Sequence, residues 1–180
     1  MGWFFWLAAG VLLFWSVGAY NRLIRLRSDV AASFTALDAA LVSRVELVRS
    51  LLPVAQVEKA GSVADARASE WAGLDGAAHQ FGASLSAARS RPLEAGAIAA
   101  LAAACDALTV AWQRVQLEAG DLAGPALPES VCAEWEQLSQ RVRSASEHFG
   151  LCVAAYNQAI AQFPALLLAW IFSFRPGRAL

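Results

Sequence analysis

Residues 3–20 read WFFWLAAGVLLFWSVGAY, and this stretch decides how the rest of the chain can be arranged. It carries no charged side chain, and tryptophan or tyrosine residues lie near both of its ends. Roughly 18 residues of α-helix span about 27 Å, close to the ~30 Å hydrocarbon core of a bilayer, and aromatic side chains concentrate at membrane interfaces. We therefore predict a transmembrane anchor over residues 1–20, in contact with membrane lipid.

Arginine side chains follow this segment at once. Arg22, Arg25 and Arg27 can reach lipid headgroups, and the positive-inside rule places such residues on the cytoplasmic side. The prediction is a single-pass protein of a bacterial inner membrane, with its amino terminus outside and the remaining residues in the cytoplasm. The alternative is a bundle secreted after signal cleavage, since Val17 and Ala19 form a tolerable cleavage site, although the usual preceding basic region is missing.

Four apolar stripes follow the anchor. In each stripe apolar residues recur at steps of three and four, which is typical of one face of an α-helix. We predict an all-α fold, in which the N-terminal transmembrane helix is followed by an antiparallel up-and-down four-helix bundle with long helices over residues 21–163. The stripes are Leu23, Leu26, Val30, Phe34, Leu37, Leu41, Val45, Val48, Leu52 and Ala55; Trp71, Leu74, Ala78, Phe81, Leu85 and Ala88; Ile98, Leu101, Cys105, Leu108, Trp112 and Val115; and Val131, Trp135, Leu138, Val142, Ala145, Phe149, Cys152, Tyr156, Ile160 and Phe163.

Proline and glycine mark the expected helix ends. Pro53 lacks an N–H and is predicted to kink the first helix or end it early. Residues 90–92 should end the second helix, residues 120–128 should form a loop, and Pro164 should stop the fourth helix.

The first and fourth helices are longer than the two between them, so their membrane-proximal ends should pair alone as a two-helix stalk. Residues 20–30 and 152–163 form this stalk and bring Asn21 into the same region as Tyr156 and Asn157. We predict a hydrogen-bonded contact of Asn21 with this pair, as a structural lock.

An apolar and aromatic tail, residues 164–180, follows the bundle. Trp170, Phe172 and Phe174 are predicted to lie at the membrane interface, with Arg175 next to them. The alternative is a tail that folds onto the bundle as additional core.

Two segments resemble the LemA family. The opening YNRLIRLR, residues 20–27, is similar to the family's YN-x-L-x-x-x-R segment. Near the carboxyl end, the residues YNQAI at 156–160, Phe163-Pro164 and FSFRP at 172–176 resemble the family's YNxAIxxFP…FxFKP pattern. The resemblance implies a membrane-anchored four-helix bundle and no particular reaction. The chain looks like a divergent member, because the family's tryptophan in the first helix is Phe34 here and an earlier Tyr-Asn pair is Phe149-Gly150. The motif residues at the two ends are Tyr20, Asn21, Tyr156, Asn157, Phe163 and Pro164.

The sequence offers no constellation for catalysis. His79 and His148 have no metal-ligand partners at helical spacing, and no phosphate-binding or nucleophile motif is present. We therefore predict no catalytic, cofactor-binding or metal site. The net charge of −1, from 14 basic and 15 acidic side chains, provides no general attraction for nucleic acid. The cysteines are predicted to be small buried apolar residues in a reducing compartment; they are Cys105, Cys132 and Cys152.

Asp38, Arg44 and Glu46 of the first helix are predicted to be ordinary solvated charges, with a partner-facing surface as the alternative. The chain is predicted to be a non-enzymatic interaction or scaffold module that binds an unidentified protein partner. A less favoured alternative is an enzyme or small-molecule carrier that uses an apolar pocket among its tryptophans; these are Trp71, Trp112 and Trp135.

Overall fold

The computed structural model describes residues 2–57, 64–121, 127–162 and 176–180, and every regular element in these ranges is an α-helix. The predicted all-α fold is confirmed for this part of the chain. The four helices are α1 (Gly2–Val57), α2 (Ala64–Ser90), α3 (Ala95–Asp121) and α4 (Glu129–Ala161).

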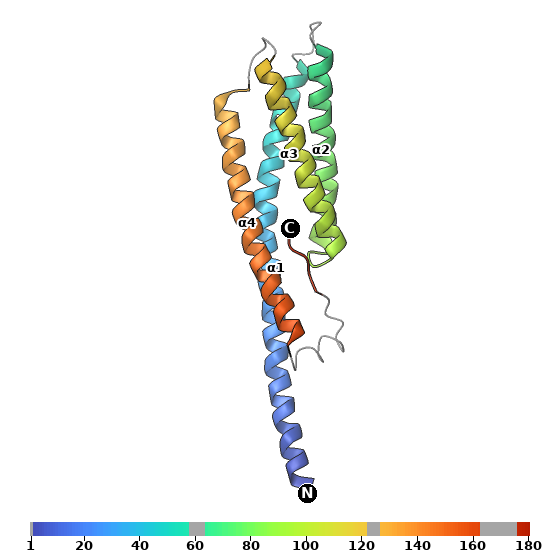
Figure 1. Ribbon diagram of the computed structural model, residues 1–180, viewed down its shortest axis with the longest axis vertical. Coiled ribbons are helices and arrows are strands. Elements are labelled where there is room, and N and C mark those ends of the chain that lie inside the picture. Colours follow the sequence, from blue (N-terminus) through green and yellow to red (C-terminus); the bar gives the residue numbers. More distant parts are fainter. Residues whose placement is uncertain (1, 58–63, 122–126, 163–175) are drawn as a thin grey trace.

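The helices form an elongated up-and-down bundle, as predicted (Figure 1). α1 packs against α4 and α2, and α2 packs against α3. The backbones of α3 and α4, in contrast, do not approach within 8 Å of each other at any described residue. Helices in direct contact have axes about 8–10 Å apart, so the bundle is open on the side between α3 and α4 except where residues 177–180 lie, with Gly177 beside Leu93 and Val153 and Ala179 beside Gly150.

The core is built from the predicted stripes. Burying these apolar faces is the main favourable contribution to folding, because the helices have little other reason to associate. Between α1 and α4, the rings of Phe34 and Phe149 meet edge to face with centroids 5.7 Å apart. Trp71 and Cys105 are only half-buried. Stripe residues that are buried include Leu23, Val30, Leu37, Leu41, Leu74, Phe81, Ile98, Leu101, Leu108, Trp112, Leu138, Phe149, Tyr156 and Ile160.

The structure agrees with the sequence-based prediction at the end of α2 but not at the end of α1. α1 continues through Pro53 to Val57, so of the two predicted effects of this proline the early helix end is wrong, and a kink stays a prediction. A proline removes one backbone hydrogen bond, and the long buried stripe before it holds the helix in place. The turn between α2 and α3 follows the prediction: the Arg91 N–H donates to the Ala88 carbonyl at 3.1 Å, and the Glu94 N–H donates to the Arg91 carbonyl at 3.0 Å.

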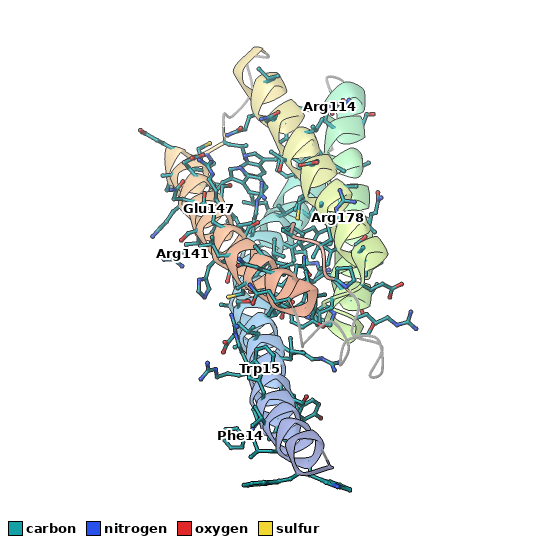
Figure 2. All side chains as sticks on the ribbon, turned by 60° about the horizontal axis from the view of Figure 1, so that its bottom comes forward. Phe14, Trp15, Arg114, Arg141, Glu147 and Arg178 are labelled. Carbon is teal, nitrogen blue, oxygen red and sulfur yellow. The ribbon has the colours of Figure 1, made fainter. Side chains whose placement is uncertain are left out.

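α1 and α4 extend beyond the α2–α3 turn and pack as a pair, so the predicted two-helix stalk is present (Figure 1). Leu23 of α1 and Tyr156 and Ile160 of α4 are buried there. Below this pair α1 continues alone. Figure 2 shows Phe14 and Trp15 pointing outward from this extension.

Among the described residues, one helical segment is long and apolar enough to cross a membrane, namely Ala95–Leu117 of α3, with a mean hydropathy of 1.6. It lies in the middle of the chain and not at the predicted amino-terminal position. The mean hydropathy of this segment reflects its many alanines, and the apolar stripe of α3 is part of the bundle core. The predicted span, residues 3–20, includes several residues whose side chains are outside the described part of the chain, and it stays a prediction.

Candidate functional site

The open side of the bundle contains a groove of about 450 Å³ between α3 and α4. Its walls include Thr109 and Trp112 of α3 and Trp135 and Ser139 of α4, while Arg44 of α1 also lines it. Small-molecule sites in proteins are concave, mainly apolar, and contain a few polar groups that orient the ligand, typically in about 300–1,000 Å³. This groove is therefore large enough for a small molecule.

Two stacked indoles bridge the gap between the separated helices. The rings of Trp112 and Trp135 lie nearly parallel, with an interplanar angle of 16° and centroids 4.4 Å apart. Because indoles are long, they can touch while the α3 and α4 backbones remain apart. The same residues thus complete the core and leave space beside it.

Arg44 is buried against this indole pair, with 6% of its surface exposed. Its guanidinium carbon lies 4.1 Å from the centroid of the Trp135 ring, a cation–π contact. Its Nη2 donates a hydrogen bond of 2.8 Å to Thr109 Oγ1, and the Thr109 hydroxyl donates in turn to the Cys105 carbonyl at 2.8 Å. Three helices therefore meet at one cation.

The charge of Arg44 is incompletely compensated. Burial lowers the pKa of its guanidinium, and negative charge at Cys105 and Glu136 acts in the opposite direction. The ion pairs found in the described part of the chain are Asp38–Arg89, Asp75–His79 and Arg91–Glu94, and none involves Arg44. A buried cation without a carboxylate in direct contact is costly to fold around.

Three buried polar atoms have no hydrogen-bond partner among the described residues: Arg44 Nε, Trp112 Nε1 and Ser139 Oγ. All three residues line the groove. Most buried polar groups in folded proteins are hydrogen-bonded, so three unsatisfied groups at one place are unusual. Two of them are N–H donors and the third is a hydroxyl, a set that suits an oxyanion.

The prediction that Arg44 is a solvated charge is wrong, and the spacing of the stripe explains the burial. Arg44 lies three residues after Leu41 and four before Val48, so it falls on the apolar face of α1. Asp38 forms two hydrogen bonds with Arg89 of α2, at 2.7 and 3.0 Å, whereas Glu46 is exposed.

A second polar site ties the end of the described chain to α4. The Asn157 amide donates from Nδ2 to the Gly177 carbonyl at 2.8 Å, and its Oδ1 accepts from the Gly177 N–H at 2.9 Å. A Cβ at Gly177 would lie 2.9 Å from Leu93 Cδ2, so glycine permits this close approach. Leu180, a few residues on, lines the groove.

This contact replaces the predicted one with Asn21. Both hydrogen-bonding ends of the Asn157 amide are used by Gly177, and Asn21 is exposed. Tyr156 is buried in the stalk, where desolvation raises the pKa of its phenol and the nearby charge of Arg27 lowers it. Residues 176–180 thus follow the alternative prediction of a tail folded onto the bundle.

The remaining predicted residues divide into two groups. Arg22, Arg25 and Arg27 are exposed on α1, and Tyr20 is half-buried. The interfacial residues of the tail and two motif residues lie outside the described part of the chain and stay predictions; they are Phe163, Pro164, Trp170, Phe172, Phe174 and Arg175.

Within the described part of the chain, no group of three or more His, Cys, Asp or Glu side chains could hold a metal ion. Trp71 does not line the groove, so the pocket suggested among three tryptophans contains two of them. No family model, curated protein or solved structure matches the chain. The LemA resemblance therefore stays a prediction.

Proposed function

We propose that this protein is a single-pass membrane protein, a divergent LemA-like member of a bacterial inner membrane, that presents its helical bundle as an interaction or scaffold module. In this proposal residues 1–20 contact lipid, the bundle lies in the cytoplasm, and its surface binds a protein partner without catalysing a reaction. An anchor raises the effective concentration of the bundle for any partner at the same membrane.

The observation that carries the proposal is the exposed apolar extension of α1. Trp3 is 77% and Phe14 is 83% exposed, and Val11 between them is also exposed. Contiguous exposed apolar surface of this kind marks a contact with another protein or with lipid. The exposed arginines that follow, Arg22, Arg25 and Arg27, support a cytoplasmic bundle through the positive-inside rule.

Membrane extraction tests the anchor. The full chain should remain in the membrane pellet after alkaline carbonate treatment, whereas the double variant Val11→Lys/Phe14→Lys should move to the aqueous fraction. A lysine near the middle of a span disfavours insertion by about 2.5–3.5 kcal/mol. Leu151→Lys, at a position of α4 that is 70% exposed, is the matched control and should remain in the pellet.

Intact mass separates this proposal from signal cleavage. Loss of the residues up to Ala19 would establish the secreted alternative, and a full-length chain in the aqueous fraction would refute both. Crosslinking in whole cells from the bundle surface then tests the scaffold role, which requires repeated recovery of one defined protein.

A further inference from the structure

The groove between α3 and α4 combines a buried cation, unsatisfied donors and aromatic walls. We propose that it binds a small organic monocarboxylate with an apolar body, and that Arg44 is the residue that pairs with the carboxylate. This inference goes beyond the scaffold role and does not depend on the membrane anchor.

The state of the Arg44 guanidinium argues for a carboxylate. Nη2 is used by Thr109 and one face lies on Trp135, but Nε has no partner among the described residues. An arginine remains protonated under all ordinary conditions, so the protein holds a positive charge at the groove without a carboxylate in direct contact. An incoming carboxylate supplies the missing charge and accepts charge-assisted hydrogen bonds.

The other unsatisfied groups extend the same argument. Trp112 Nε1 can donate only, and Ser139 Oγ can donate to a second carboxylate oxygen or accept from a ligand hydroxyl. These residues belong to opposite walls of the groove, one to α3 and one to α4. A ligand that uses both would connect the two helices whose backbones do not meet.

The charge of the lining favours a single negative charge. The charged side chains of the lining are Arg44, Arg143 and Glu136, and of these only Arg44, with its single positive charge, is buried. A phosphate dianion would exceed this charge, whereas a monocarboxylate balances it. Trp135 and Val142, which keep a small exposed fraction of 6% and 8%, supply apolar contacts for the rest of the ligand, and Trp112 backs the Trp135 ring from the core.

Cysteine alkylation provides a test in the full-length wild-type protein. Cys132 lines the groove, whereas Cys152 contacts His148 and does not line it, and both thiols are half-buried. Naphthoate serves as the probe and naphthamide, which has the same rings without the charge, as its control. Naphthoate should slow the alkylation of Cys132 by iodoacetamide several-fold, as measured by mass spectrometry, while naphthamide and the Cys152 rate show no such effect.

The variant Arg44→Met tests whether Arg44 binds the carboxylate. Methionine fills similar apolar space without a buried charge, so the variant should remain folded and lose naphthoate affinity by about tenfold or more. Arg141→Gln, at an exposed position of α4 that does not line the groove, should retain the wild-type affinity.

Equal protection of Cys132 by naphthoate and naphthamide would overturn the proposal, and so would equal protection of Cys132 and Cys152. A folded Arg44→Met protein that keeps the wild-type affinity would also overturn it. The wild-type comparison of the two probes decides the question even if Arg44→Met does not fold.

Discussion

The two sides of α4 differ in how they are filled. Toward α1, α4 packs directly, as the edge-to-face contact of the buried Phe149 with Phe34 shows, and Tyr156 of the same helix is also buried. Toward α3, its backbone stays apart, and Trp135 bridges the distance to Trp112 above a buried arginine. We call the first side the closed seam and the second the open seam.

The comparison teaches that the closed seam supports the fold and the open seam leaves chemistry available. Close-packed apolar residues in the closed seam satisfy one another and offer a ligand nothing to bind. The open seam contains a charge and three unsatisfied polar atoms next to a groove. Retaining such groups costs stability, and functional sites are where folded proteins tolerate that cost.

Truncating a side chain in the closed seam should lower the free energy of unfolding most. Phe149 is fully buried and meets Phe34 edge to face, so Phe149→Ala should lower the free energy of unfolding by about 4 kcal/mol. Denaturant unfolding followed by circular dichroism measures this change. Leu151→Ala, two residues away and 70% exposed, is the control and should change stability little. Similar losses for both variants would mean that α1 and α4 are not packed as described.

Trp135→Ala should cost less, although tryptophan is the larger side chain. Its loss removes the stack with Trp112 and the contact with Arg44, but the adjoining groove lets neighbours and water fill the space. We expect a decrease of about 2 kcal/mol in the free energy of unfolding, measured in the same way. If Trp135→Ala lowers the free energy of unfolding more than Phe149→Ala does, α3 and α4 are in close contact in solution and the open seam does not exist as described.

The sequence predicted the number, order and inward faces of the helices, because apolar residues at steps of three and four leave few alternatives. It did not predict the open seam, since the distance between α3 and α4 depends on how two large indoles meet. Arg44 was misassigned because charged residues are usually solvated, although its spacing from Leu41 and Val48 already placed it on the buried face. The partner of Asn157 was missed since Gly177 is 20 residues away and the contact is tertiary.

Asn157→Ala tests how the tail residues reach the open seam. The substitution removes both hydrogen bonds to Gly177, at about 0.5–1.5 kcal/mol each, so the expected loss of stability is about 1–3 kcal/mol. The amide of Gly177 should exchange hydrogen markedly faster. Gln158→Ala, at the exposed next position, should leave that exchange unchanged. Equal protection of the Gly177 amide in the wild type and in Asn157→Ala would show that other contacts hold the tail.

Cys105 gives the most local test of the open seam. Burial is the main reason that the pKa of its thiol is raised from 9.0 to about 11, while the nearby Arg44 charge lowers it. The folded state therefore favours the neutral thiol. The stability that this preference contributes is fully present below pH 9 and is lost as the pH rises toward about 11. The free energy of unfolding should fall over this interval more in the wild type than in Cys105→Ala. Arg44→Met should enlarge the fall, because without the neighbouring cation the thiol pKa rises further; an unchanged or smaller fall would place the guanidinium too far from the thiol to act on it.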